Sequence, residues 1–176
     1  MEDFLKELQA WQPFFITLAG VSATLAGLLF VAVSLQPAKQ EEGARTNLRR
    51  LAEHTFADLV QVLFIGVFFA VPGQPPSFYG ISMVAITGMG LREPLRRLLE
   101  TWRDRDHVTH RRHFINRLGL SLVGRALLCV GGISLILSHA TAAQIEDAMS
   151  YVCSGSVVLL IAAMRNAWFL MLQEMS

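Results

Sequence analysis

The chain has 176 residues, of which 53% are hydrophobic and 16% are charged, and its mean hydropathy is +0.44. A soluble domain carries more charge than this because its surface faces water, so the composition excludes an ordinary soluble protein. Two cysteines are too few for a disulfide framework or a cysteine-rich zinc site. We therefore expect an all-α fold, a polytopic bundle of transmembrane helices that forms one integral membrane domain over residues 1–176.

Five apolar runs predict about five membrane segments, and they lie at 14–35, 56–71, 78–91, 118–138 and 148–172. The first, fourth and fifth each hold about 20 residues or more, enough to cross a hydrocarbon core of about 30 Å. The second and third are shorter, and the third reaches only about 20 Å. We expect these two to form a tight hairpin, with a re-entrant pair as the alternative.

Basic residues alternate with the apolar runs in a way that predicts orientation. The connections at 36–55 and 92–117 are rich in Lys and Arg, whereas 72–77 and 139–147 contain neither. Short connections with Lys and Arg are retained on the cytoplasmic side. The pattern therefore predicts two basic cytoplasmic loops that meet anionic lipid headgroups, with the N-terminus outside and the C-terminus cytoplasmic.

Small residues recur at helical spacing in two of the runs. Ala19, Ala23 and Gly27 follow one another every four residues, and Gly155 and Ala163 lie eight residues apart in the last run. Small residues let helices approach closely, which matters in lipid because hydrophobic burial no longer drives helix association. We expect these faces to pack the bundle, with self-association through the first helix as the alternative.

Polar residues inside the apolar runs form a second candidate site, made up of Asp58, Gln61, Arg125, Arg165 and Asn166. A charge at bilayer depth costs at least about 2.5 kcal/mol and usually faces protein or water. Asp58 is therefore expected to pair with Arg125 or Arg165, and Gln61 shares its helix face. The expected role is a pair that fixes helix register. The alternatives are an ion or proton pathway and contact with lipid headgroups.

Three histidines in the second basic connection, His107, His110 and His113, have a spacing that allows metal ligation on a helix. Arginines surround them, and fixed positive charge disfavours a divalent cation. We predict no metal site and instead a basic amphipathic segment against anionic lipid, with histidines that titrate near neutral pH. Aromatic residues that could stack on a base, such as Trp102, are few in this segment, so we expect no nucleic-acid partner.

Catalytic motifs are absent from the sequence, which has no GxSxG, HExxH, Walker A or GxGxxG pattern. The serines of the apolar runs have no His or Lys in local register to activate them. The expectation is a protein that is not an enzyme and that needs no cofactor.

Four segments of the chain form a recognisable pattern, namely Phe14-Phe15, AGVSATLAGLLFVAVSL at 19–35, Val71-Pro72-Gly73-Gln74-Pro75 and Asn166-Ala167-Trp168. In these segments the chain is similar to a widespread, uncharacterised family of small bacterial multi-pass membrane proteins. Some members of that family are labelled as modulators of a membrane-bound AAA protease. The resemblance implies the bacterial inner (plasma) membrane and a regulatory role, and it assigns no functional residues.

Two functions fit these observations. In the first, the chain is a non-enzymatic accessory or regulatory subunit that associates through small-residue helix faces and basic cytoplasmic loops. In the second, copies assemble into a homo-oligomeric ion channel or pore. The side chains of Asp58 and Arg125 discriminate between them. If they point toward each other inside one subunit, the first function is favoured, and if they face an axial cavity, the second is.

Overall fold

The computed structural model describes residues 2–35, 42–103, 108–137 and 142–173 of the chain. Side chains are described for most of these residues but not for 2–3, 42–48, 50, 92–118, 142 and 171–173. The described residues form five α-helices and no strand, which confirms the helical bundle. The helices are α1 (Glu2–Ser34), α2 (Glu42–Ala70), α3 (Pro76–Arg103), α4 (Val108–Leu137) and α5 (Ala142–Gln173).

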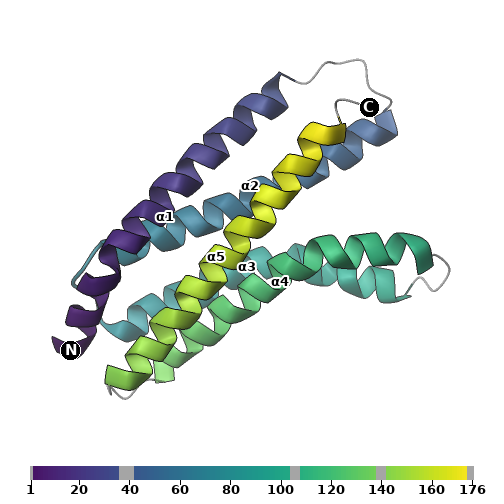
Figure 1. Cartoon of the computed structure of the whole chain (residues 1–176). Helices are drawn as coiled ribbons and strands as arrows, with labels where there is room; N and C mark the ends of the chain where they lie inside the picture. The colour runs from purple at the N-terminus through teal and green to yellow at the C-terminus, as the bar shows by residue number, and fades with distance from the viewer. Residues whose placement is uncertain (1, 36–41, 104–107, 138–141, 174–176) are drawn as a thin grey trace.

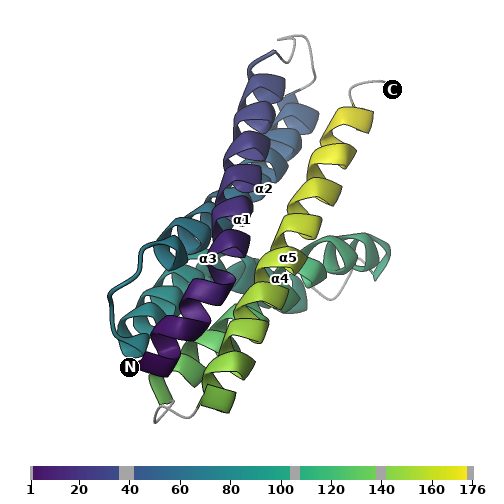
Figure 2. The same cartoon turned by 60° about the vertical axis from the view of Figure 1, so that its left-hand side comes forward.

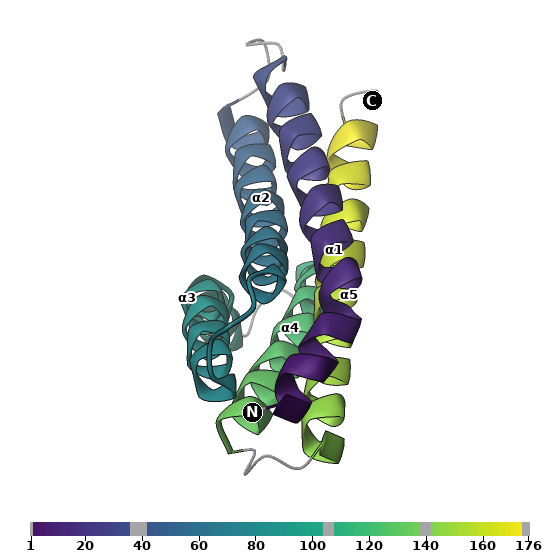
Figure 3. The ribbon, with the colours of Figure 1, turned by 90° about the vertical axis from the view of Figure 1, so that its left-hand side faces the viewer.

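Successive helices run in opposite directions, so the first residues of α1 and the last of α5 lie at opposite ends of the bundle (Figure 1). Helices α1, α2 and α5 pack along one another, while α4 packs between α3 and α5 (Figure 3). The pair α3 and α4 leans away from the other three, so the C-terminal end of α3 and the N-terminal end of α4 project to one side (Figure 2). The bundle therefore has a three-helix part, formed by α1, α2 and α5, and a splayed pair, formed by α3 and α4. The pair packs against α5 and α2.

Four helices contain stretches that are long and apolar enough to cross a membrane, namely Phe4–Ser34, Leu51–Ala70, Gly119–Leu137 and Ala143–Leu170. Three of these stretches overlap the three long apolar runs of the sequence. The short second run joins them because its helix extends in the N-terminal direction, which lengthens the apolar stretch to 20 residues. Within the described residues α3 is not among the four, in keeping with its having the shortest apolar run.

Helix α1 extends further toward the N-terminus than the apolar run at 14–35. Helix α1 begins at Glu2 and continues through Pro13. Phe4 is fully buried, with its ring centroid 5.5 Å from that of Tyr79 on α3. Gln12 also donates from Nε2 to the carbonyl of Ala70 at 2.9 Å, which satisfies an acceptor at the C-terminal end of α2. The first turns of α1, which precede the apolar run, are therefore part of the folded bundle.

The two basic connections are helical over most of their length. Helix α2 begins at Glu42, α3 continues past Pro94 to Arg103, and α4 begins at Val108. The physical reason is composition, because leucine, arginine and glutamate are good helix formers and glycine is scarce there. His107 lies outside the described residues. The backbone at 110 and 113 belongs to α4, and the side chains of these two histidines are not described.

Glycines mark the closest helix crossings. A Cβ added at Gly80 of α3 would lie 2.6 Å from the carbonyl oxygen of Gly132 on α4. One added at Gly155 of α5 would lie 2.9 Å from the carbonyl oxygen of Gly124 on α4. These backbones touch directly, as expected for helices that associate in lipid through small residues. Between α2 and α3, Gly73 has a φ of 110°, a left-handed conformation that glycine adopts without strain.

The small-residue stripe of α1 contributes to the bundle at one end only. Ala19 lies against α2, where a Cβ added at Gly66 would approach its Cβ to 2.9 Å. Ala23 and Gly27 are exposed, so within one chain they pack against no other helix. A spacing of four residues advances by about 40° around a helix at each step. The stripe therefore turns away from the buried face, which carries Ser22 and neighbouring apolar residues.

The corresponding residues of α5 lie inside the bundle. Gly155 faces α4 at the crossing described above, and Ala163 is fully buried. Ala163 belongs to a second apolar cluster that also contains Leu29 of α1 and Leu59 of α2. The two small-residue faces predicted from the sequence thus differ. The face of α5 packs against other helices of the chain, whereas most of the face of α1 does not.

Candidate functional site

The candidate site is an ion pair buried between α2 and α4. The side chain of Asp58 is 0% exposed and that of Arg125 is 2% exposed. Arg125 donates from Nη2 to Oδ1 of Asp58 at 2.6 Å. A hydrogen bond between two charged groups is stronger than one between neutral groups. Of the two arginines that the sequence offered as partners for Asp58, it is Arg125 that forms this bond.

Neutral side chains extend the ion pair into a network across three helices. Ser121, one turn from Arg125 on α4, donates from Oγ to both carboxylate oxygens of Asp58, at 3.1 and 2.9 Å. Gln61 accepts from Nε of Arg125 at 3.2 Å and donates from Nε2 to Oγ1 of Thr87 on α3 at 3.3 Å. These three neutral residues are buried as well. The network therefore joins α2, α3 and α4 in the interior.

The absence of a side chain at Gly90 makes room for this network. A Cβ added there would lie 2.9 Å from Oε1 of Gln61 and 3.3 Å from both Nε and Nη2 of Arg125. The polar groups thus occupy the space that a larger residue of α3 would fill. Glycine at this position allows the guanidinium to lie against the α3 backbone.

A histidine adds a titratable group to the carboxylate. His54 lies one turn before Asp58 on α2, with Nδ1 3.4 Å from Oδ2. Its side chain is 15% exposed, so the ring reaches toward the surface of the bundle, while its Nε2 atom is buried. Within the described part of the chain, two buried nitrogens of the cluster have no hydrogen-bond partner, namely Nε2 of His54 and Nη1 of Arg125.

The charges of the cluster determine what it can do. Asp58 carries one negative charge and Arg125 one permanent positive charge, so the pair is neutral when His54 is neutral. A buried carboxylate that is bonded to arginine and serine is a poor nucleophile, and the described residues hold no group of three or more His, Cys, Asp and Glu side chains that could bind a metal ion. The arrangement suits the task of holding the helices in register.

Replacing Gln61 by leucine is expected to lower the free energy of unfolding by about 1–3 kcal/mol, because a buried donor that loses its partner pays its full desolvation cost. Nε of Arg125 and the hydroxyl of Thr87 both lose a partner in this variant. Thr87→Val is the matched control, since it leaves the bond from Arg125 to Gln61 intact. Denaturation in mixed detergent micelles measures both changes. An equal loss of unfolding free energy in the two variants would show that the bond from Arg125 to Gln61 adds nothing to stability.

The other members of the predicted polar cluster lie elsewhere. Arg165 is exposed on α5, and Asn166 beside it is buried. Neither takes part in the hydrogen bonds described above. Analysis of the sequence missed Ser121, Thr87 and His54. For His54 and Ser121 a signal was present, because each lies four residues before a charged member of the site and so shares its helix face.

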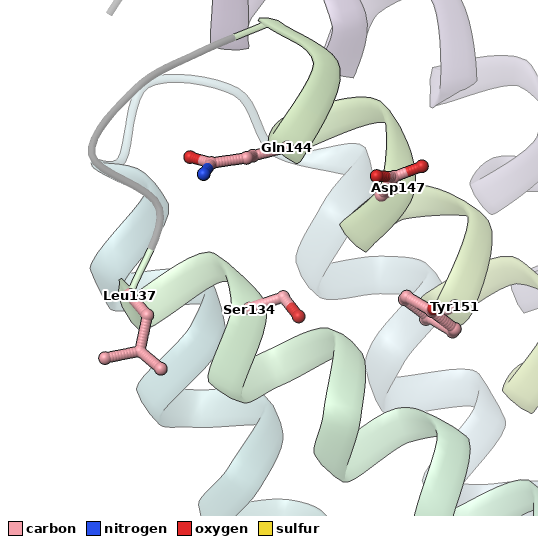
Figure 4. A pocket seen from close by; sticks show the side chains of 5 residues that line it. All are labelled: Ser134, Leu137, Gln144, Asp147 and Tyr151. Atoms are coloured by element: carbon pink, nitrogen blue, oxygen red, sulfur yellow. The ribbon is translucent and has the colours of Figure 1, made fainter.

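A surface hollow of about 250 Å³ lies at one end of α4 and α5. Figure 4 shows Ser134 and Leu137 of α4 across from Gln144, Asp147 and Tyr151 of α5. Gln144, Asp147 and Tyr151 are exposed, and none of the unpartnered buried polar atoms lies here. The hollow is an open notch between two helix ends, so the buried network remains the stronger candidate site.

Comparison with known proteins gives no match. No family model matches the chain, and neither a curated protein nor a solved structure is similar to it at a significant level. The function is therefore argued from the geometry of the chain itself.

Proposed function

We propose that this chain is a non-enzymatic multi-pass protein of a bacterial inner membrane that acts as an accessory or regulatory subunit. The observation that supports this most directly is the direction of the two buried charges. Asp58 and Arg125 bond to each other inside one chain. Their charges neutralise each other there, and the same groups are not left to line an axial pathway between copies.

A pore built from several copies requires polar side chains that face the shared axis. Asp58, Gln61 and Arg125 are all buried within the single chain. The outward faces of the membrane helices are apolar instead, and large exposed residues include Phe30 of α1 and Ile161 of α5. These features favour association with lipid or with a partner helix over permeation.

The exposed side of α1 is the surface that fits a partner helix. Gly20, Ala23 and Gly27 lie there, and Cβ atoms added at the two glycines would touch nothing within 4 Å. The hydroxyl of Thr24 donates to the carbonyl of Gly20 at 2.8 Å, so it adds no unpaired donor to this surface. Small residues on a lipid-facing helix allow close approach of a second helix. The glycines at the helix crossings of α3, α4 and α5, by contrast, pack against neighbouring helices of the same chain.

The orientation is part of the same proposal. The N-terminus lies outside and the C-terminus lies in the cytoplasm, which puts the basic helical segments beside anionic headgroups or a cytosolic protein. The resemblance of α1 and the α2–α3 turn to bacterial membrane proteins labelled as protease modulators is consistent with this role. The partner would then be a membrane protein with at least one transmembrane helix.

Photocrosslinking tests the docking surface in the native membrane. A photoreactive amino acid at Ala23 is expected to capture a different membrane protein, and the same group at Ala126 of α4, which is also exposed, serves as the matched control. Gly27→Leu is expected to reduce the yield from position 23 at least tenfold, because a leucine blocks close approach. The bundle itself should fold normally, since Gly27 contacts no neighbouring helix.

The outcomes of this experiment are distinct. Capture of the chain by itself alone, from position 23, would contradict the accessory role and favour a homo-oligomer. Equal capture from positions 23 and 126 would show that α1 is not the docking surface.

A further inference from the structure

We propose that the notch between the C-terminal end of α4 and the N-terminal end of α5 binds a primary ammonium group, presented by a zwitterionic lipid headgroup or by a free amine. Two residues of α4 and three of α5 line this notch, namely Ser134, Leu137, Gln144, Asp147 and Tyr151 (Figure 4). The site is a property of the single chain and does not rest on the accessory role proposed above.

The notch lies where the surface of a membrane meets the bundle. Leu137 is the last residue of the apolar stretch Gly119–Leu137, and Gln144 is the second residue of the stretch Ala143–Leu170. An apolar stretch of helix ends where the hydrocarbon core gives way to headgroups. Tyr151, two turns further along α5, belongs to a residue type that is enriched at this boundary, because its ring is apolar and its hydroxyl is polar. Lipid headgroups therefore surround the notch.

The polar side chains of the notch are free to bind a ligand. Within the described part of the chain, no hydrogen bond or ion pair involves the side chains of Ser134, Gln144, Asp147 and Tyr151. The hydroxyl of Ser156 on α5, by contrast, donates to the carbonyl one turn earlier at 2.7 Å, as serine commonly does inside a helix. The hydroxyl of Ser134 thus keeps both its donor and its acceptor for another partner.

The charge of the notch selects a cation. Among the described residues that line it, Asp147 carries the charge, which is negative. Residues 138–147 contain no Lys or Arg. Lys6 of α1, at the same end of the bundle, is exposed and does not line the notch (Figure 1). A carboxylate in these surroundings attracts an ammonium group and repels a phosphate.

A primary ammonium group has three N–H donors, and the notch offers it several acceptors. The carboxylate of Asp147, the amide oxygen of Gln144 and the hydroxyl oxygen of Ser134 each accept hydrogen bonds. The ring of Tyr151 adds a face that attracts a cation. A quaternary ammonium group, as in a choline headgroup, has no N–H donor for these acceptors. The volume of about 250 Å³ equals that of about eight molecules of liquid water, enough for a small headgroup.

Native mass spectrometry of the full-length protein in detergent micelles tests this site. Ethanolamine and choline lipids with identical acyl chains, both without net charge, are titrated separately at about pH 8, where an ordinary imidazole such as that of His139 is neutral. The ethanolamine lipid is expected to bind about fivefold more tightly, because only its headgroup donates hydrogen bonds to Asp147. A second arm titrates the lipid-free protein with ethanolamine in solution and follows binding by saturation-transfer NMR.

The matched variants are Asp147→Asn and Glu146→Gln. Both carboxylates are exposed, so both variants should fold, but Glu146 does not line the notch. Asp147→Asn is expected to abolish the fivefold preference, estimated from an exposed ion pair of about 1 kcal/mol, and Glu146→Gln should preserve it.

The outcomes distinguish the sources of the ammonium group. A preference for the ethanolamine lipid that depends on Asp147 assigns the site to headgroups. Binding of free ethanolamine that depends on Asp147, without that preference, assigns the site to a soluble amine. Absence of both, or an equal loss in Asp147→Asn and Glu146→Gln, would overturn the proposal. The comparison of the two lipids on the unaltered protein needs no variant.

Discussion

Replacing Arg125 by leucine is expected to lower the free energy of unfolding by about 3–5 kcal/mol, the usual cost of removing one partner of a buried ion pair. Asp58 is fully buried, and Arg125 supplies the permanent positive charge beside it. Without the guanidinium, the carboxylate loses its strongest bond and Gln61 loses a donor. Unfolding of the purified variant in mixed detergent micelles, followed by circular dichroism, measures the change.

A second substitution separates the cost of the orphaned charge from the cost of lost packing. The double variant Asp58→Asn with Arg125→Leu removes both charges, and it is expected to recover at least half of the lost stability. Residues in direct contact give interaction energies that a double-mutant cycle isolates. A stable, correctly assembled Arg125→Leu protein with altered ion flux in liposomes would contradict the structural role of the pair and favour a pore.

The second large effect is expected at the crossing of α3 and α4. Gly80→Ala places a Cβ 2.6 Å from the carbonyl oxygen of Gly132 and 2.8 Å from Cγ1 of Ile136. The first of these neighbours is backbone and cannot rotate away, so the helices must separate. Overpacking of this kind costs about 1–3 kcal/mol. The packing of α3, which carries Thr87, against α4, which carries Arg125, should loosen with it.

The matched control for that crossing is Gly27→Ala, the same chemical change at an open position of α1. A Cβ there meets nothing within 4 Å, and alanine in a helix is preferred to glycine by about 1 kcal/mol. Gly27→Ala should therefore leave stability unchanged or raise it. Similar losses in both variants, measured by denaturation in micelles, would show that the crossing at Gly80 is not a close one.

Much of the fold follows from local patterns in the sequence. Apolar runs of about 20 residues predict helices that can cross a membrane, because lipid leaves backbone groups no partners other than their own. The inclusion of Asp58, Gln61 and Arg125 in the candidate site rested on the same logic, since polar residues at bilayer depth need a protein environment. What local pattern could not decide was whether Arg125 or Arg165 is the partner. That choice depends on how α4 and α5 are rotated against α2.

Other features depend on tertiary packing and were not accessible from spacing alone. A row of residues four apart does not stay on one face of a straight helix, so the row of α1 left the buried side after Ala19. Thr87 joined the site because α3 passes close to Gln61, which requires glycine at position 90. The basic connections were expected as loops because their charge excludes them from lipid, but charge does not prevent helix formation in water.

Native mass spectrometry of the tagged full-length protein, extracted gently from the membrane of its own cells, tests the accessory role most directly. The account predicts a complex that contains a second membrane protein in fixed stoichiometry with this chain. The protein that a photoreactive group at position 23 of α1 captures should be this same second protein. A closed homo-oligomer without any partner would contradict the accessory role and make ion flux through that assembly the function to measure.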